Sequence, residues 1–410
     1  MAKITDIRCI RTRFDGSWTL VQVMTDSDGL YGLGSASDLY NPEAVVQVIE
    51  QLFAPLLLGR DTAQIEDIWQ TMQHSGYWRH GSVTQTAISG IDMALWDILG
   101  KEAGLPVYRL LGGPARAAVP CYGHASGNSI SELTEDVYRY QEEGYSVIRC
   151  QLGGYGGGGF IQDTSGHSSR LPQNAWVKDQ YFDEQTYLNS VSAMFEQLRL
   201  EFGNELRFTH DVHEHLTPIS AIQLAKRLEP YSLFFLEDAL PPDQLGWYRQ
   251  LRAQSSTPQA VGELFTHPQE WLPLVQERLI DFVRMRVSKA GGITACRKIA
   301  ATCEAFGVRT AWQEGGENDP VNQAAAVHLD MAIWNFGIQE INHFREHELE
   351  AFPGHIHRIG GYLYPSDKPG LGIELDEVKS RMLLQKDWKS SDYYRPYPLD
   401  RKADGTIVRP

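Results

Sequence analysis

Eight short apolar runs, each ending in polar or charged residues, recur along the chain after about residue 118. The runs end near His124, Arg149, Asp211, Glu237, Glu263, Arg286, Gln313 and Glu340. Six of the seven gaps between these residues agree to within a few residues, and a strand followed by a helix needs about two dozen residues. The pattern predicts an α/β fold with an eight-stranded TIM-type barrel, in which the one long gap holds an insertion at residues 152–205.

The first part of the chain has a different pattern. Its first 40 or so residues alternate apolar and polar side chains around turn signals such as Asp28-Gly29, which predicts a short antiparallel meander. Helical periodicity follows, and each helical stretch stops at a proline or a glycine. We therefore expect an α+β capping domain at residues 1–117, the barrel at residues 118–355, and a C-terminal segment at residues 356–410 that completes the capping domain.

The charge and composition exclude several classes of partner. The formal net charge of −15 argues against nucleic acid and anionic membranes, because phosphate binding requires clustered Lys and Arg. No apolar run approaches the roughly 18 residues of a membrane-spanning helix, and the first residues contain no apolar signal core. The five cysteines are widely spaced and form no Cys-x-x-Cys pair, which is typical of reduced intracellular thiols. These features predict a cytoplasmic protein that binds a small molecule.

A run of glycines, GGYGGGG at residues 153–159, invites comparison with phosphate-binding loops. It has neither the GxxxxGK[ST] order nor a GxGxxG placed between a strand and a helix, so the sequence does not favour phosphate binding. Long insertions without regular structure are usually lids or linkers. A mobile loop over the barrel mouth is the interpretation that we prefer.

Three acids, Asp211, Glu237 and Glu263, are separated by two equal steps of 26 residues. Each comes at the end of one predicted strand, so their side chains converge at the end of the barrel where TIM-barrel enzymes place their active sites. Converging carboxylates require a cation, and ligands that are all oxygen favour octahedral Mg²⁺ over Zn²⁺. The alternative is that each acid only caps a helix or pairs with a barrel Lys or Arg.

The residues around these acids also resemble those of a known family. The chain resembles the enolase superfamily in the segments LFFLEDALPP, VGELF, VSKAGGIT, ALWDILGKEAGLPVYRLLGG and PGLGIELDE. It resembles the mannonate dehydratase branch, the D-galactonate/D-mannonate dehydratase group, in DVHEHLTP, CYGHASG, ITACRKIAATCEAFGVRTAW and NFGIQE. The resemblance implies an N-terminal capping domain completed by C-terminal residues, a (β/α)7β barrel, and a homo-oligomer. It also implies that Mg²⁺ on the three acids supports abstraction of the proton next to a carboxylate, through an enediolate.

The resemblance assigns roles to further residues. It implies catalytic roles for His213 and Arg149, and substrate contacts at His124, Arg284, Gln313, Glu317 and Glu340. His213 follows Asp211 by two residues, so it faces the same cavity and could act as a general acid or base. Arg149 and Arg284 could hold the distal carboxylate or hydroxyls of an acid sugar. Either arginine could equally form a structural pair with Glu340.

Two positions depart from the branch. Its active members are expected to carry a tyrosine a dozen residues beyond the strand-two arginine, where this chain has Ile161, and a histidine on strand seven, where it has Gln313. Neither side chain can transfer a proton. Tyr155, in the glycine run, could replace the missing tyrosine only if the loop folds inward.

Other branches of the superfamily fit less well. Muconate-lactonising and dipeptide-epimerising enzymes resemble the chain less, because their Lys-x-Lys pair falls on Arg149, Cys150 and Gln151, and their strand-six lysine falls near Arg286. Arginine is a poor base, since its pKa is above about 12. A mandelate-racemase-like mechanism needs a histidine at Gln313.

Two functions therefore remain open. The first is a lyase, an Mg²⁺-dependent acid-sugar (aldonate) dehydratase-like enzyme with low or no activity on D-mannonate. The second is a divergent member that binds a sugar acid, with a sensing or regulatory role and no dehydration. The sequence does not determine the substrate or the oligomeric state.

Overall fold

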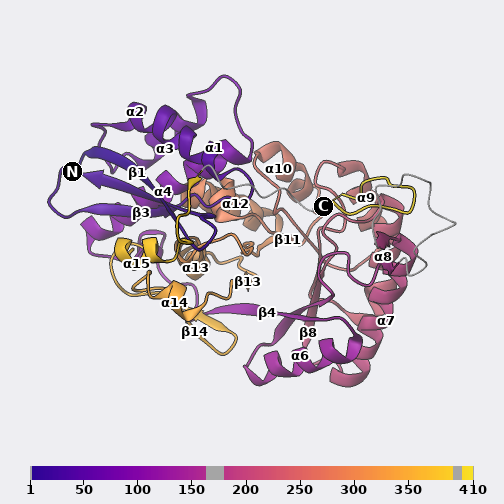
Figure 1. The fold of residues 1–410 in the computed structure, drawn as a ribbon. Helices are drawn as coiled ribbons and strands as arrows, with labels where there is room; N and C mark the ends of the chain where they lie inside the picture. Colours follow the sequence, from indigo (N-terminus) through magenta and orange to yellow (C-terminus); the bar gives the residue numbers. More distant parts are fainter. Residues whose placement is uncertain (1, 163–179, 391–398, 410) are drawn as a thin grey trace. The chain divides into compact units, whose positions relative to one another are not determined.

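The computed structural model describes residues 2–162, 180–390 and 399–409, which form two compact units. The first unit contains Met1–Cys121, Glu263–Glu270 and Arg284–Arg395, and the second contains Tyr122–Gly262, Trp271–Val283 and Pro396–Pro410. Figure 1 shows the course of the chain through its helices and strands. No helix in the described parts of the chain is both long and apolar enough to cross a membrane.

Parallel strands form the framework of the second unit. In spatial order they are β4 (Val119–Gly127), β5 (Val147–Leu152), β8 (Arg207–Asp211), β9 (Phe235–Glu237), β10 (Gln259–Val261) and β11 (Phe282–Val283). Each neighbouring pair is parallel, and β9, β10 and β11 are buried along their whole length. Strands that are buried on both faces read as short continuous apolar runs, which is the pattern seen in the sequence.

Helices connect these strands, as parallel pairing requires. The helices are α6 (Ile130–Glu142), α7 (Glu184–Phe202), α8 (Pro218–Leu228), the 3₁₀ turn η2 (Glu229–Tyr231), α9 (Leu245–Gln254) and α10 (Pro268–Gln276), the last of which begins in the first unit. α6 shows why such segments are helical: Leu133, Val137 and Tyr140 recur at four and three residues and are buried on one face. Its N-cap, Ser129, accepts a hydrogen bond from the Glu132 amide. Burial of each such side chain contributes about 1.5–3 kcal/mol.

The segment between β5 and β8 contains both irregular and regular structure. After the glycine run, β6 (Phe160–Gln162) and β7 (Gln180–Phe182) pair in antiparallel register, and α7 follows at once. The final hairpin of the chain, residues 399–409, also belongs to the second unit, where the Phe182 amide donates to the Arg401 carbonyl at 2.8 Å. The predicted insertion at 152–205 therefore includes helix α7, and the described C-terminal residues contact its neighbour β7.

The first unit contains the meander that the sequence predicts. β1 (Ile4–Thr12), β2 (Trp18–Thr25) and β3 (Tyr31–Ser35) form an antiparallel sheet. The 22-residue helix α4 (Ser82–Ala103) packs directly on β3. A Cβ atom at Gly34 would lie only 1.9 Å from the Gly90 carbonyl oxygen, so this close approach of strand and helix requires a glycine.

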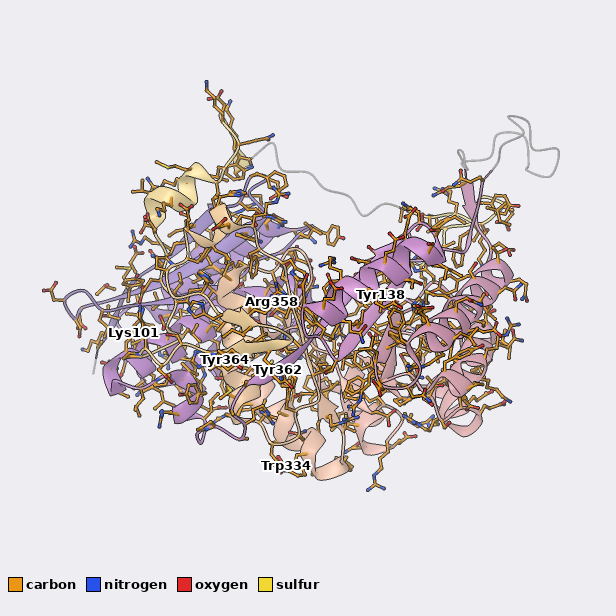
Figure 2. The ribbon with its side chains drawn as sticks, turned by 90° about the horizontal axis from the view of Figure 1, so that it is seen from below. Lys101, Tyr138, Trp334, Arg358, Tyr362 and Tyr364 are labelled. Atoms are coloured by element: carbon orange, nitrogen blue, oxygen red, sulfur yellow. The ribbon has the colours of Figure 1, made fainter. Side chains whose placement is uncertain are left out.

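The first unit also contains further helices and short strands. They are α1 (Pro42–Gln47), the π-helical η1 (Val48–Phe53), α2 (Ala54–Leu57), α3 (Ile65–His74), α5 (Val107–Leu110), α11 (Val287–Ala290), α12 (Gly292–Phe306), β12 (Arg309–Thr310), α13 (Pro320–Ala332), β13 (Gln339–Glu340), α14 (Glu346–Leu349), β14 (His357–Ile359), β15 (Tyr362–Tyr364) and α15 (Glu377–Met382). β15 pairs with the first residues of β4. Tyr362 and Tyr364, labelled in Figure 2, are exposed on either side of the buried Leu363.

Candidate active site

The predicted acids end neighbouring strands. Asp211 lies directly opposite Glu237 in the β8–β9 register, and both side chains are almost fully buried. Glu237 in turn pairs with Ala260 of β10, and Glu263 follows that strand after Gly262. Residues that are opposite each other in a sheet point to the same face. The strand register therefore brings Asp211 and Glu237 to one side at the carboxyl ends of the strands, as predicted.

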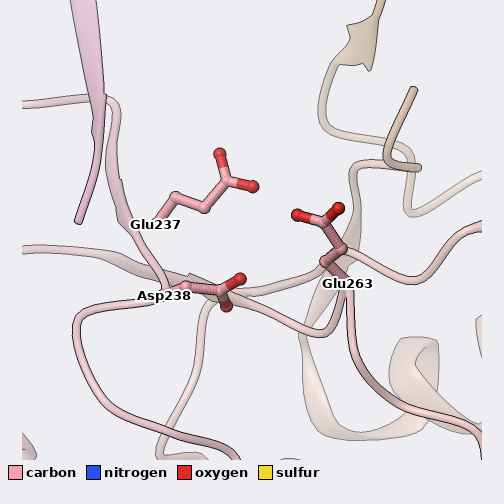
Figure 3. Close-up of side chains that lie close together, drawn as sticks. All are labelled: Glu237, Asp238 and Glu263. Carbon is pink, nitrogen blue, oxygen red and sulfur yellow. The ribbon is translucent and has the colours of Figure 1, made fainter. Parts of the chain in front are cut away.

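The structure brings a fourth acid, Asp238, together with Glu237 and Glu263, and Asp211 is not a member of this group of three. Figure 3 shows the side chains of Glu237, Asp238 and Glu263, whose carboxylates each offer an oxygen atom within 4.8 Å of the others. Asp238 has a φ of +40°, so the alternation of side chains along β9 does not continue through it. Sequence reasoning missed Asp238 because strand alternation turns the residue after Glu237 to the other face. The donors are all carboxylate oxygens, which fit a hard cation such as Mg²⁺.

Asp211 is flanked by the two residues predicted to be catalytic. The Arg149 Nη1 atom lies 3.5 Å from its Oδ2 atom, and the His213 Nδ1 atom lies 3.6 Å from the same oxygen. The His213 amide donates to Asp211 Oδ1 at 2.9 Å. His213 and Glu214 both have a positive φ, +53° and +59°, which is rare for side chains of this size. Such a backbone costs on the order of 1–3 kcal/mol and persists only where its surroundings hold it.

Tyr155 of the glycine run lies against His213. The two rings are stacked, with centroids 3.9 Å apart and planes inclined by 12°. The Arg149 guanidinium lies 5.5 Å from the Tyr155 ring centroid, within the range of a cation–π contact. Ile161 lies in β6 opposite Tyr181. The inward fold that would let Tyr155 approach the site is therefore present.

The glycine run is closely packed. The Gly157 and Gly159 amides donate to the Gly154 and Gly156 carbonyls at 3.0 Å, and Ser190 Oγ donates to the Gly158 carbonyl at 2.8 Å. These contacts close successive turns of the run. Its carbonyl groups and amides thus bond within the second unit.

His124 lies next to this group. It is opposite Arg149 in the β4–β5 register, and both side chains are partly buried. Arg149 is opposite Thr209, two residues before Asp211 on β8. His124 and Arg149 therefore lie one pair of residues below the acids along the strands, on the same face.

Four other predicted residues lie in the first unit. Arg284 donates from Nη2 to Glu340 Oε2 at 2.8 Å, and both side chains are almost completely buried. The Glu314 amide donates to the same oxygen at 2.7 Å. The structure thus pairs Arg284 with Glu340, one of the two structural pairings that the sequence left open.

Arg286 connects the other two predicted residues of this unit to a metal-ligand candidate. Its Nη2 atom donates to Glu263 at 2.8 Å, its Nε atom donates to Gln313 Oε1 at 2.6 Å, and Nη1 forms an ion pair with Glu317. Gln313 Oε1 also accepts from the Gly315 amide at 3.2 Å. Gln313 thus serves as an acceptor that fixes Arg286. Sequence reasoning considered Arg286 only as a poor base and missed this role.

Burial changes the ionisation of one residue beside this group. It raises the pKa of Glu314 well above the usual range of a carboxyl, because the side chain is buried and lies near Glu340. The Asn322 side-chain amide donates to Glu314 Oε1 at 2.6 Å. Burial therefore favours the neutral form of the Glu314 carboxyl.

The chain matches known protein families over most of its length. Residues 7–112 match the mandelate racemase / muconate lactonizing enzyme N-terminal domain, and residues 132–379 match the enolase C-terminal domain-like family. The chain belongs to the enolase superfamily. The predicted fold class, an α+β N-terminal capping domain with a (β/α)7β barrel, is thereby confirmed.

Similar proteins narrow this assignment. The chain is 73% identical, over all of both chains, to the D-galactonate dehydratase family member Pjdr2_1176 of Paenibacillus sp. (strain JDR-2). It is 44% identical to the family member Dd703_0947 of Musicola paradisiaca (strain Ech703), over 100% of this chain and 99% of the relative. An enolase from Pantoea ananatis, solved with bound D-gluconate and Mg, has 42% identity and a TM-score of 0.93 over 100% of both chains. The chain thus belongs to the D-galactonate dehydratase family, as its sequence resemblance implied.

Proposed function

We propose that this chain is an Mg²⁺-dependent acid-sugar dehydratase, a hydro-lyase acting on an aldonate, with low or no activity on D-mannonate. The observation that carries the proposal is the arrangement around Asp211, whose carboxylate lies beside Arg149 and His213 and opposite Glu237. The solved Pantoea ananatis relative supports the substrate class, because it binds D-gluconate and Mg. Family membership supports the reaction class.

Asp211, Glu237 and Glu263 would hold the ion, with Asp238 beside them. The oxygen-only donor set fits Mg²⁺, and Cys or His ligands that would favour a softer metal are not part of the cluster. When bound, the ion supplies positive charge that stabilises the enediolate by several kcal/mol, which a side-chain base alone could not do.

His213 is the proposed general acid or base. Its backbone N–H bond to Asp211 and the stacked Tyr155 ring fix the imidazole at the strand end. Protons enter and leave an imidazole in the ring plane, so a ring stacked on its face fixes the orientation without blocking transfer. Arg149 keeps a full positive charge at any physiological pH and would bind the developing negative charge or the carboxylate of the sugar acid.

The substrate contacts would come from His124, Arg284, Gln313, Glu317 and Glu340. The two departures from the branch support weak activity on mannonate. Ile161 has no titratable group, and Gln313 is held as an acceptor by Arg286. Only His213 and, in place of the missing tyrosine, Tyr155 remain to move protons.

A library of aldonic acids tests this function. Purified protein is incubated with Mg²⁺ and each acid, and 2-keto-3-deoxy products are assayed. We expect turnover of at least one aldonate other than D-mannonate, and its loss in His213→Asn. The matched control is Asp404→Asn, an exposed acid in the C-terminal hairpin that accepts from the Thr406 amide in the same turn. No product with any acid would overturn the proposal.

A second function, sugar-acid binding without dehydration, is favoured by the same departures, Ile161 and Gln313. Titration calorimetry would then show Mg²⁺-dependent binding of D-gluconate without any product. Restoration of turnover by Ile161→Tyr with Gln313→His would identify the missing groups as the cause. We also expect a cytoplasmic homo-oligomer, whose size light scattering can measure.

A further inference from the structure

His215 is a buried histidine that the proposed reaction does not use. It lies two residues beyond His213, and only 3% of its surface is exposed. Its Nδ1 atom lies 2.8 Å from the His213 carbonyl oxygen and 3.2 Å from that of Val212. Because two carbonyl oxygens face this nitrogen, Nδ1 carries the proton and donates. The His215 ring therefore donates a hydrogen bond to the carbonyl group of His213, whose own φ is positive.

The glycine-rich turn packs on the same imidazole. A Cβ atom at Gly156 would lie 2.8 Å from His215 Cδ2, and Gly156 has a φ of +68°. Only glycine allows the chain to come so close in this conformation. The neighbouring residue in the turn is Tyr155, which stacks on His213. The ring of Phe182 lies against His215 at a centroid distance of 5.5 Å.

The C-terminal hairpin, residues 399–409, closes the remaining side. The Asp400 carboxylate lies 3.5 Å from His215 Nε2, facing the edge of the ring opposite Nδ1. Hydrogen bonds hold the hairpin to itself and to β7 and α7, and three of them show this. The Val408 amide donates to the Asp400 carbonyl at 2.9 Å, Phe182 donates to Arg401, and Lys402 Nζ donates to Glu184 at 2.7 Å.

We propose that His215 is a positioning residue that holds His213 and the glycine-rich turn in one arrangement, so that the Tyr155 ring lies on the His213 ring. In this arrangement the C-terminal hairpin lies against the same ring, with the Asp400 carboxylate 3.5 Å from Nε2. The inference rests on the proposed function in one respect, since it takes His213 as the proton-transfer group. The consequence is that the C-terminal hairpin and the glycine run, residues 153–159, together determine the orientation of the His213 ring at the end of β8.

Hydrogen exchange measured by mass spectrometry tests this positioning. We expect His215→Ala to speed the exchange of amides in residues 153–160 by about tenfold or more, because the turn loses the ring on which it packs. His215→Asn keeps an amide nitrogen near the position of Nδ1 but has no ring, so it should restore the bond to the His213 carbonyl and only part of the protection. Asp404→Asn, in the same hairpin, should leave exchange unchanged. Unchanged exchange at 153–160 in His215→Ala would overturn the proposal.

Ligand binding supplies a second readout that a merely structural role would not move. D-Gluconate is titrated in the presence of Mg²⁺ into the parent, Tyr155→Ala, His215→Ala and the double variant. If His215 acts through Tyr155, the double variant binds no more weakly than the weaker single variant, whereas independent roles give multiplied losses and contradict the proposal. If the parent itself does not bind D-gluconate, the proposed function is at fault, and the exchange experiment still decides the role of His215. If His215→Ala does not fold, Asp400→Ala is measured by the same exchange, and unchanged protection there counts against the hairpin's part.

Discussion

The strand ends of the two units use their charged groups in different ways. At the ends of β8 and β9, Asp211 and Glu237 are opposite each other, and His213 beside them has a strained backbone and a stacked ring. In the first unit, Arg284 and Glu340 form a buried ion pair that also accepts a backbone amide. The first arrangement places two carboxylates on one face, with the Arg149 guanidinium beside one of them. The second neutralises its own charge.

This contrast separates residues that can do chemistry from residues that shape a site. Arg286 is a residue that shapes the site, because its three guanidinium nitrogens contact Glu263, Gln313 and Glu317. A side chain with three partners has little freedom to follow a reaction. The strained His213, by contrast, is held by its backbone while its ring remains partly exposed.

The largest expected effect is the loss of the buried ion pair. Arg284→Ala removes the guanidinium that pairs with the buried Glu340 carboxylate, which should lower the free energy of unfolding by about 3–5 kcal/mol. Urea unfolding followed by circular dichroism measures it. Arg249→Ala is the control, because its ion pair with Glu277 lies at the surface and should matter little. A loss no greater than that of the control would show that Glu340 is compensated in another way.

The second prediction concerns the reactive side of the comparison. His213→Asn should lower turnover of any aldonate that the protein dehydrates by about 100-fold or more, because a positioned acid or base contributes this much. The free energy of unfolding should barely change, since the His213 ring is partly exposed. Measuring kcat and the urea midpoint together separates the two effects. A stability loss as large as that of Arg284→Ala would mean that His213 is structural.

The third prediction tests whether Asp238 belongs to the acid cluster. Asp238→Asn removes one charge within 4.8 Å of Glu237 and Glu263 and should weaken Mg²⁺ binding by about 10–100-fold. Calorimetry with Mg²⁺ alone measures this affinity. Asp243→Asn is a suitable control, since Asp243 is an exposed acid only a few residues further along the chain. Equal Mg²⁺ affinity in both variants would remove Asp238 from the metal centre.

The regular parts of this molecule could be predicted, and the reason is periodicity. A parallel strand and its helix consume a fixed length of chain, so the recurrence of apolar runs located β4, β5, β8, β9 and β10, and the equal spacing of Asp211, Glu237 and Glu263 placed them at strand ends. Residues that leave this periodicity were missed. Asp238 has a positive φ that no local sequence signal indicates.

Contacts between distant segments could not be predicted either. The hydrogen bond from Arg286 to Gln313 joins residues that are 27 positions apart in the sequence. From the sequence alone, Gln313 was notable only because the branch is expected to have a histidine there. Tyr155 reaches His213 because Gly156 packs on His215, a contact that depends on the three-dimensional course of the glycine run. The sequence showed that Tyr155 could replace the missing tyrosine only if the loop folds inward. It did not show whether the loop does so.

The fourth prediction concerns how the free energy of unfolding depends on pH through Glu314, a residue of the first unit. Burial raises the pKa of Glu314 well above its ordinary value of 4.5, so the folded chain keeps a proton there that the unfolded chain releases. Stability from this group is complete below 4.5 and falls as the pH rises from there toward the folded pKa. Glu314→Gln should flatten this part of the profile, measured as urea midpoints at several pH values. An unchanged slope would mean that Glu314 is ionised in the folded chain.

The smallest expected effect distinguishes the ring of Tyr155 from its hydroxyl. Tyr155→Phe keeps an aromatic ring that can stack on His213 at the same distance, so D-gluconate affinity should change by less than about twofold. Tyr155→Ala removes the stack and should weaken binding more. Turnover gives the sharper distinction, because a phenylalanine cannot transfer a proton. If Tyr155→Phe binds D-gluconate normally but turns over about 100-fold more slowly, the Tyr155 hydroxyl takes part in proton transfer. The strand end of β8 then has a second proton-transfer group beside His213. If both binding and turnover are retained, Tyr155 acts only by holding the imidazole, and His213 is the one proton-transfer group on that side.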